Sequence, residues 1–549
     1  MSANHQGRYA IKWRPGAHGE AVFEGGSLLA LAGRIREPVQ LITHPGSGAI
    51  GLGAGGETVP LQTGEDGDYP WLGTLPAMYP EWLGDRTFQE THGVRFAYVT
   101  GEMAQGIASP QMVIAAAEAG FLGFLGAAGM PLTRIEAAVR EFKQALDPRS
   151  LPYGVNVIHS PHEPAMEERT IELLMNEGVR RVSASAFMKL SPAIVRYACT
   201  GLAADERGRV IRRHHLFVKL SRPEVARHFL SPAPRAMLEV LVAEGKLTET
   251  EATLAARVPL AEDVTVEADS GGHTDNRPLP SLFPVIAELR DRLAASFGYT
   301  RPIRLGAAGG IGSPAGAASA FALGASYIVT GSVNQAAVES GMSEAGKRML
   351  AQAEMADVVM APSADMFELG VKVQVLKRGT LFSSRASELY EVYRKYGSLE
   401  AIPQDVRSKL ETNVFRAGLD DIWNETARFF GNRDPEQLRK ADADPKYRMA
   451  LVFRWYLGNA SKWGIQGSEE RRQDYQIWCG PAMGAFNAWV ANTKLEPLGA
   501  RTVAQIGLNL LEGAARLTRM HQLRTYGVPV PGEAFRYAPV IWKAHGTKS

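Results

Sequence analysis

The sequence predicts an α/β protein whose centre is a (β/α)8 TIM barrel. Eight short apolar runs alternate with helical stretches over roughly 235 residues, the number and span typical of that fold. The runs are continuous rather than alternating in polarity, as expected for parallel strands buried on both faces. We expect the eight strands at Phe96–Thr100, Leu122–Gly126, Tyr153–Ile158, Arg181–Ala186, Leu216–Leu220, Asp263–Ala268, Ile303–Gly306 and Tyr327–Gly331.

Helix boundaries between these runs support the barrel. Serine caps a first helical turn, and proline suits the next position because its missing N–H would be unpaired there anyway. Gly120 and Gly324 follow two of the helices, where a left-handed residue is needed. The Ser-Pro pairs are Ser109-Pro110, Ser160-Pro161, Ser191-Pro192 and Ser313-Pro314.

The chain divides into three parts. Residues 1–90 form a small N-terminal segment, rich in Gly and Pro, to which the sequence assigns no fold. Residues 91–335 form the barrel, and its charged connection 231–262 is long enough to be an inserted helical hairpin. Residues 336–549 are mostly helical, strongly so from Val333 to about Arg524, and suit a substrate-binding or lid region.

Composition excludes several classes of protein. Sixty Lys and Arg against 58 Asp and Glu give a net charge of +2, with no global reason to expect nucleic acid or a membrane surface as partner. Two cysteines, without metal-ligand spacing, indicate neither a disulfide framework nor a metal site, and favour a cytoplasmic setting. No signal pattern and no apolar stretch of about 18 residues is present. The basic run 212–215 is interpreted as a solvated loop, with a local basic patch as the alternative.

The loops after strands seven and eight predict a phosphate site. They read GAAGGIGSP and TGSVNQ, and TIM barrels commonly bind phosphate at this position. Glycine lets backbone N–H groups approach an anion, and the helix dipole favours negative charge. A tight turn alone is the alternative. The expected cradle consists of Gly309, Gly310, Ile311, Gly331 and Ser332.

Other strand ends offer groups for chemistry. The loop after the sixth strand places His273 at the barrel mouth, where imidazole can transfer a proton or only bind and orient. Asn156 lies near the end of the third strand, where it is either a ligand or a loop cap. Lys219 lies within the fifth strand, where a lysine is costly unless it points into a polar site or reaches solvent.

The motifs SGGH, AAGGI and TGS resemble the nitronate monooxygenase and flavin-dependent enoyl reductase superfamily. Three longer stretches are similar to one branch, the PfaD-type enoyl reductases, which act in trans for polyunsaturated-fatty-acid synthases and trans-acyltransferase polyketide synthases. They read ADSGGHTDNRPLPSLFP, MADVVMAPSADMFELGVKVQVLKRGTLF and YEVYRKYGSLEAIP. The resemblance runs from roughly residue 90 to 530.

The resemblance implies bound FMN, NADPH as electron donor, and reduction of a 2-enoyl thioester on an acyl carrier protein. His273 takes the position of the superfamily's active-site histidine. Gly309, Gly310, Gly331 and Ser332 would take the FMN phosphate. The rest of the implied flavin pocket is Ala104, Gln105, Gly106, Ala127, Ala128, Gly129, Met130, Asn156, Lys219, Ser270, Gly271 and Gly272.

Two other functions remain open at this stage. One is a nitronate monooxygenase-type flavin oxidase on the same scaffold, and the other is a non-catalytic docking protein of a synthase. No strand–GxGxxG–helix fingerprint with a following acidic residue occurs, so NADPH is expected to visit the flavin face rather than occupy its own domain. The helical C-terminal part is expected to supply acyl and carrier-protein contacts, with plain packing or homodimerisation as the alternative.

Overall fold

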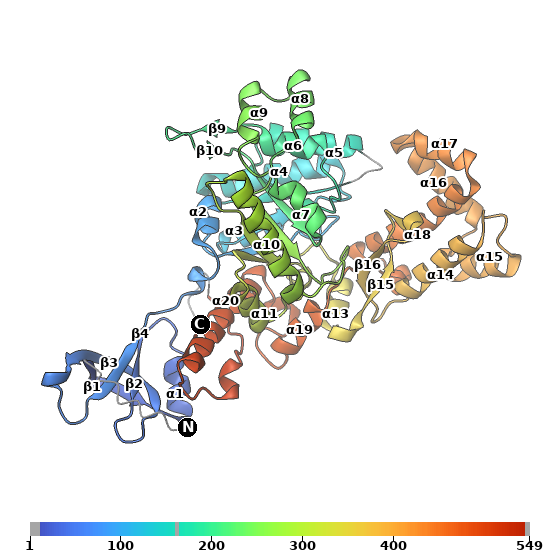
Figure 1. The fold of residues 1–549 in the computed structure, drawn as a ribbon. Coiled ribbons are helices and arrows are strands. Elements are labelled where there is room, and N and C mark those ends of the chain that lie inside the picture. The colour runs from blue at the N-terminus through green and yellow to red at the C-terminus, as the bar shows by residue number, and fades with distance from the viewer. Residues whose placement is uncertain (1–10, 160–163, 544–549) are drawn as a thin grey trace.

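The computed structural model describes residues 11–159 and 164–543. At its centre, eight parallel strands form a closed barrel in sequence order (Figure 1). The predicted fold class and all eight predicted strands are therefore confirmed. The strands are β5 (Tyr98–Thr100), β6 (Leu122–Leu125), β7 (Gly154–Ile158), β8 (Arg181–Ser185), β11 (His215–Leu220), β12 (Asp263–Glu267), β13 (Arg304–Ala308) and β14 (Tyr327–Thr330).

Helices cover the outside of the barrel. Ser109, Ser191 and Ser313 each accept a hydrogen bond from the backbone N–H three residues later, as the Ser-Pro pattern predicts. Ser160 lies outside the described residues. The helices between strands are α3 (Pro110–Glu118), α4 (Leu132–Leu146), α5 (Pro164–Asn176), α6 (Pro192–Cys199), α7 (Pro223–Leu230), α10 (Leu279–Phe297) and α11 (Pro314–Ala322), and α12 (Ser332–Gln335) follows β14.

The long connection after β11 contains two helices, α8 (Arg235–Ala243) and α9 (Glu249–Ala255), as predicted for a helical hairpin. A capping box at Thr248 and Glu251 starts α9. A small ribbon of β9 (Ala203–Ala204) and β10 (Val210–Ile211) lies beside this hairpin (Figure 1).

The N-terminal part forms a second, smaller closed barrel of four strands. Its largest buried side chain is Trp13. The many glycines of this part resemble loop composition, but the packing requires at least one of them. A Cβ on Gly56 would clash with the Trp13 ring and the Arg14 carbonyl. Its elements are β1 (Ile11–Val22), α1 (Gly25–Ala32), β2 (Val39–Thr43), β3 (Ile50–Pro60) and β4 (Tyr69–Leu75). The next helix, α2 (Arg86–His92), packs against the large barrel (Figure 1), where Phe88 joins the apolar cluster inside the ring of strands.

The C-terminal part is mostly helical, as expected, and contains one antiparallel hairpin that the sequence did not predict. The hairpin consists of β15 (Val358–Pro362) and β16 (Lys372–Leu376). Valine favours the strand conformation, and the valines of one strand pair with residues of the other, as Val359 does with Val375. The helices are α13 (Glu344–Ala351), α14 (Phe382–Lys395), α15 (Gln404–Leu410), α16 (Leu419–Arg433), α17 (Pro435–Ala443), α18 (Pro445–Gln466), α19 (Ala482–Val490) and α20 (Val503–Thr525).

Helix α20 joins the parts of the molecule. It packs against α11 and α3 of the large barrel. Gly507 and Gly513 make this approach close, since a Cβ on Gly513 would lie 2.6 Å from the Pro314 side chain. Near its end, Met520 and Leu523 share an apolar cluster with the N-terminal barrel.

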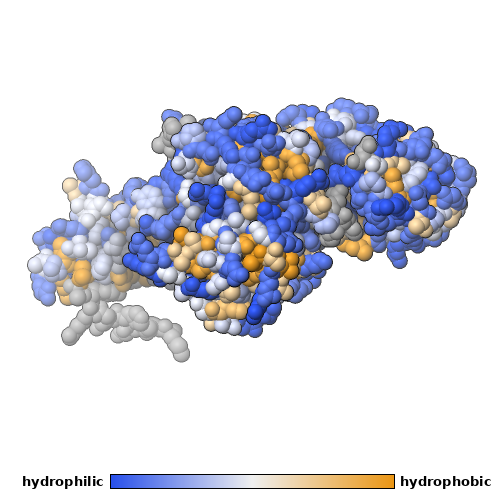
Figure 2. All heavy atoms as spheres, turned by 90° about the horizontal axis from the view of Figure 1, so that it is seen from above, coloured by the Kyte–Doolittle hydropathy of each residue, from blue (hydrophilic) through white to orange (hydrophobic). Residues whose placement is uncertain are grey.

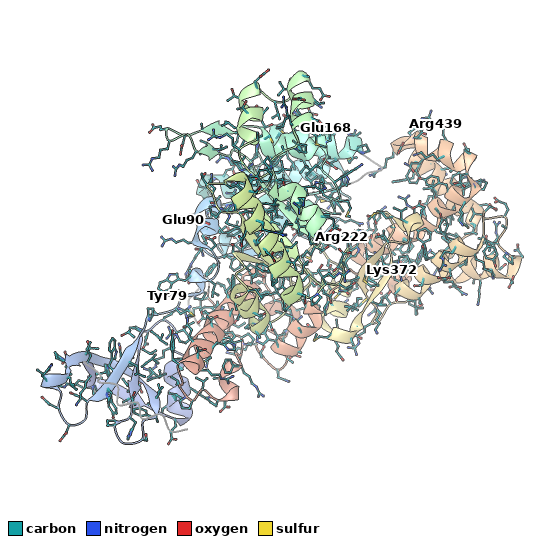
Figure 3. The ribbon with its side chains drawn as sticks, viewed as in Figure 1. Tyr79, Glu90, Glu168, Arg222, Lys372 and Arg439 are labelled. Carbon is teal, nitrogen blue, oxygen red and sulfur yellow. The ribbon has the colours of Figure 1, made fainter. Side chains whose placement is uncertain are left out.

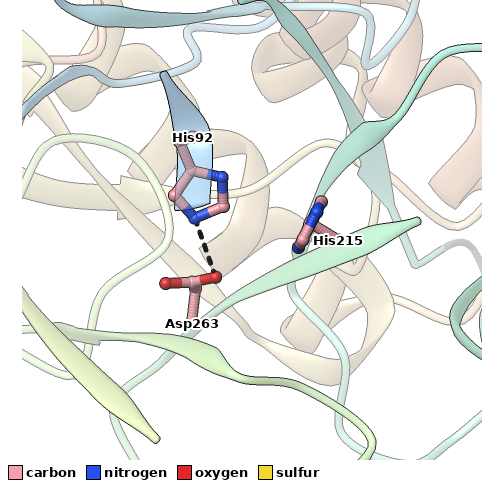
Figure 4. Close-up of side chains that lie close together, drawn as sticks. All are labelled: His92, His215 and Asp263. Carbon is pink, nitrogen blue, oxygen red and sulfur yellow. Dashed lines mark hydrogen bonds and ion pairs between the residues drawn. The ribbon is translucent and has the colours of Figure 1, made fainter. Parts of the chain in front are cut away.

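A buried ionic cluster closes the barrel at the amino ends of its strands (Figure 4). Asp263 begins β12 and accepts two bonds from Arg304, at 2.6 and 2.7 Å. His92 Nε2 lies 3.0 Å from the same carboxylate, and His215 lies alongside. Burial lowers the pKa of His215 to about 2 and holds it neutral. Since Arg304 and nearby Arg181 already supply positive charge here, the cluster is poorly suited to a cation.

The basic run 212–215 is mostly buried in the same region, so its interpretation as a solvated loop is wrong. Arg212 is paired with Glu262, and both side chains are only 3% exposed. His214 is buried, and only Arg213 reaches solvent. The run is therefore largely interior and is neither a solvated loop nor a basic patch.

The molecular surface is mostly hydrophilic in the view of Figure 2, with separated apolar clusters over the central barrel. Among the described residues, no helix combines the length and apolar character needed to cross a membrane.

Candidate active site

Most of the predicted site residues lie at or just beyond the carboxyl ends of the barrel strands, where TIM barrels place their sites. The SGGH loop follows β12 and is fixed from outside the barrel. Gly272 and Gln374 of β16 exchange backbone hydrogen bonds of 2.9 and 2.7 Å. The buried Gln374 side chain also donates to Asp269 Oδ1 and to the Ser270 carbonyl, each at 2.9 Å. The hairpin β15–β16 therefore determines where this loop lies.

His273 meets an acidic partner from the same hairpin. Its Nε2 lies 3.3 Å from Asp365 Oδ2 and 3.4 Å from Ser363 Oγ. Burial alone would lower the pKa of His273, but the hydrogen bond and charge of Asp365 outweigh it and raise the pKa above its usual value. The imidazole is thereby held toward its protonated form.

Sequence reasoning gave Ser363 and Asp365 no role. Both stand in the stretch MAPSADMFELG, which carried part of the family resemblance. Their distance from His273 along the chain hid the pairing, because no local pattern links a barrel loop to a distant hairpin.

Replacing Asp365 with asparagine is expected to lower the pKa of His273. The amide cannot supply the negative charge that now outweighs burial. Titration of histidine-labelled protein by NMR measures this directly. The variant Ser363→Ala, which keeps the carboxylate, serves as the control and is expected to shift the pKa much less. An unchanged pKa in Asp365→Asn would show that the pair does not set the charge of His273.

Lys219 points into the barrel mouth and is buried between two carboxylates. Its Nζ lies 3.0 Å from Glu267 Oε1 and 3.5 Å from Glu102 Oε1. Burial favours the neutral amine, but the two carboxylates raise the pKa above its usual value, so the ammonium stays charged. The alternative of a lysine reaching solvent is wrong.

Asn156 belongs to the same network and does not cap a loop. Its Nδ2 donates to the Ser183 carbonyl at 2.9 Å and to Ser185 Oγ at 2.6 Å. Both serine hydroxyls in turn donate to Glu102, at 2.6 and 3.2 Å. Glu102 and Glu267 were given no role from the sequence, although Glu102 stands two residues after β5 and Glu267 ends β12, positions that mark candidate site residues.

The loops after β5 and β6 are tied to each other. Gln105, in the left-handed region at φ 58°, donates its backbone N–H to the Ala128 carbonyl at 2.8 Å. Its side chain donates to Ser461 of α18 at 2.9 Å. Gly106 donates to Gly126 at 2.9 Å. The structure therefore brings together the set predicted here: Ala104, Gln105, Gly106, Ala127, Ala128, Gly129 and Met130.

The predicted phosphate cradle has an open backbone. Gly309 and Gly310 have φ of 87° and 70°, which only glycine adopts freely. A Cβ on Gly309 would lie 2.7 Å from the Ala268 backbone, whereas Gly310 and Gly331 face open space. Ile311 is buried, and Ser313 caps α11 next to the turn. Backbone N–H groups at the start of a helix such as α11 can bind an anion.

A further segment, 478–482, lies over this cradle and was not predicted. Gly480 donates its N–H to Ser332 Oγ at 3.0 Å, and the Trp478 carbonyl accepts from Gln335 at 2.8 Å. A Cβ on Gly312 would clash with the Ala482 carbonyl. The sequence Cys-Gly-Pro offered a turn signal but no indication of where it packs.

Comparison with known proteins gives these loops a family context. The family model for nitronate monooxygenase matches residues 87–393, more than half of the chain. The chain belongs to the nitronate monooxygenase family. A second model, for the inserted helical domain of [acyl-carrier-protein] S-malonyltransferase, matches residues 396–475.

Relatives of this nitronate monooxygenase family member include parts of large synthases. A polyunsaturated fatty acid synthase component of Thraustochytrium sp. is 46% identical over 467 residues, covering 83% of this chain and 31% of the relative. Polyketide biosynthesis protein PksE of Bacillus subtilis is 44% identical over 437 residues, covering 80% and 56%. The chain thus spans between about a third and about half of these relatives.

A solved structure also matches. The enoyl reductase domain of MlnA, from the macrolactin biosynthesis cluster of Bacillus amyloliquefaciens, is 39% identical with a TM-score of 0.78, covering 81% of this chain and 99% of that domain. The family and branch that the sequence motifs resemble are thereby confirmed.

Proposed function

We propose that this family member is an FMN-dependent enoyl reductase that acts in trans. It reduces the 2,3 double bond of an enoyl thioester on an acyl carrier protein, with NADPH as electron donor. One observation carries the proposal: an open glycine cradle and the His273–Asp365 pair lie at one barrel mouth, joined by the loop after β12. The matching MlnA enoyl reductase domain supports it.

The residues present fit FMN. Gly310 and Gly331 leave room for the phosphate, while Ser332 and the α11 start supply polar groups beside it. Charged Lys219 and the amide of Asn156 suit a polar ring edge. Bound FMN would supply hydride transfer between NADPH and the β-carbon of the thioester.

The chain's own residues would donate the proton and place a positive charge beside the reacting groups. Protonated His273 would give its Nδ1 proton to the α-carbon as the double bond is reduced, and Asp365, which faces Nε2, would stabilise the imidazolium beforehand. Buried Lys219 would place a positive charge beside the site, with Glu102 and Glu267 fixing its position.

Purified protein tests this proposal. We expect a flavin absorption spectrum and NADPH oxidation that depends on a crotonyl thioester. Oxygen uptake with a nitroalkane, without crotonyl reduction, would favour the nitronate monooxygenase-type oxidase. A colourless protein that binds no added FMN would favour the non-catalytic docking protein.

Replacing Gly310 with aspartate is expected to weaken FMN binding by more than roughly tenfold, since like charges a few ångströms apart repel strongly at a partly buried site. Aspartate tolerates the φ of 70° at this position, and the space beside it is open, so the fold should persist. Gly310→Asn, of matched size and neutral, is the control and should bind FMN more tightly than the aspartate variant. Flavin fluorescence titration measures both affinities. Equal FMN affinities of the aspartate and asparagine variants would show that the phosphate does not bind at this turn.

A further inference from the structure

A groove of about 600 Å³ opens beside the barrel mouth, between the starts of α7 and α10. It continues outward along the two helices into a smaller groove of about 230 Å³. Its apolar floor includes Val285, which is 49% exposed, and Leu282. Arginines line both stretches: Arg222 and Arg277 at the inner one, Arg227 and Arg292 at the outer one.

The inner end of the groove is part of the active-site loops. Ser221 stands two residues after Lys219, and Asp275 stands two residues after His273. Arg222 donates two hydrogen bonds to Asp275, at 2.9 and 2.8 Å, and so joins the loops. Figure 3 shows Arg222 on the flank of the barrel that faces the helical C-terminal part. The inner end of the groove is therefore lined by the two loops that follow Lys219 and His273 along the chain.

The groove carries an uneven charge. Four arginines line it against two carboxylates, Glu224 and Asp275, whereas the whole chain has a net charge of only +2. Arg222 is already engaged by Asp275. Arg227 and Arg277 are exposed, and no ion pair to either occurs within residues 11–159 and 164–543. Two arginines are thus available to an anionic partner beside an apolar floor.

We propose that this groove receives the phosphopantetheine arm of the acyl carrier protein that delivers the enoyl thioester. The inference rests on the proposed function. The arm is a narrow chain with an anionic phosphodiester at its protein end and the thioester at the other. The thioester enters at the His273 end, the phosphodiester lies against Arg277, and carboxylates around the carrier's prosthetic serine face Arg227 and Arg292. Charge complementarity of this kind sets orientation and speeds encounter.

Reversing the charge of groove arginines, and assaying each variant with two substrates, tests whether the groove binds the carrier-bound arm. For Arg227→Glu and Arg277→Glu, we expect kcat/KM with a crotonyl-loaded acyl carrier protein to fall by roughly tenfold or more. With the crotonyl thioester of N-acetylcysteamine, which has neither phosphate nor carrier, it should stay within about twofold. The matched control Arg86→Glu reverses an exposed arginine on α2 and should change neither.

Two kinetic outcomes would overturn the proposal. One is an equal loss of kcat/KM with both substrates, which would show that the arginines support the fold or the chemical step rather than carrier binding. The other is a loss with the carrier substrate in Arg439→Glu, on α17, and not in the groove variants, which would move docking to the helical part (Figure 3).

Binding separates this inference from the proposed function. A fluorescently labelled carrier protein with the arm attached should bind the wild type more tightly than the same carrier without it, and Arg277→Glu should abolish that difference. This result can be obtained even if the protein reduces no enoyl thioester. Equal binding of both carrier forms by the wild type would contradict the groove as the arm's site.

Discussion

The variant His273→Ala is expected to keep its flavin and lose most of its turnover, by about 10²- to 10⁴-fold in kcat, the usual contribution of a positioned acid. His273 is the imidazole that the β15–β16 hairpin holds beside the predicted cofactor site, and Asp365 keeps it charged. Its removal takes away the proposed proton donor and leaves the predicted phosphate cradle unchanged. The steady-state rate with a crotonyl thioester and the flavin spectrum of the same sample measure the two effects together.

Half-reactions sharpen this prediction. Reduction of the flavin by NADPH without oxygen should proceed in His273→Ala, whereas reoxidation by the crotonyl thioester should be slow. His18→Ala, at an exposed position of the small N-terminal barrel, is the matched control and should behave as wild type. Unchanged enoyl reduction in His273→Ala would remove this residue from catalysis.

The variant Arg304→Met should destabilise the fold by about 3–5 kcal/mol, the cost of leaving a buried charge unpaired. Asp263 is 1% exposed, and Arg304 bonds to both of its oxygens. Chemical denaturation monitored by tryptophan fluorescence measures the change. The double variant Arg304→Met with Asp263→Leu should recover much of the loss, because the carboxylate of Asp263 is then no longer left buried without its arginine partner.

The ionic pair also gives stability a pH dependence. Although burial opposes ionisation, His92 and Arg304 hold the pKa of Asp263 well below its usual value, so the unfolded chain binds this proton more readily. The contribution to the free energy of unfolding is therefore present above the usual pKa of an aspartate and is lost as pH falls. A free energy of unfolding for Arg304→Met within about 1 kcal/mol of wild type would contradict this role.

The sequence predicted the large barrel well because its signals are local. A continuous apolar run followed by Ser-Pro specifies a strand and the next helix without reference to the rest of the chain. The glycine turn was predictable for the same reason, because Gly309 and Gly310 mark it and the order of strands places it; that it binds phosphate stays a prediction.

What the sequence could not provide depends on distant pairings. Asp365 acts on His273 only because β16 pairs with the loop after β12, and no periodicity encodes that contact. Glu102 gains its role from serines on a different strand and from Lys219. The four-stranded N-terminal barrel was hidden because its glycines resemble loop composition, although Gly56 is required by the close approach of Trp13.

The position of α20 bears on how this protein is made. The helix covers α11 and α3, yet Val503, where it begins, is synthesised long after Thr330, the end of β14 and of the ring of strands. Until then the apolar surfaces around Pro314 and Phe121 have no cover, so a nascent chain halted after Thr330 should bind chaperones that recognise exposed apolar segments. Translation of the last helix would then be the event that releases the barrel from them.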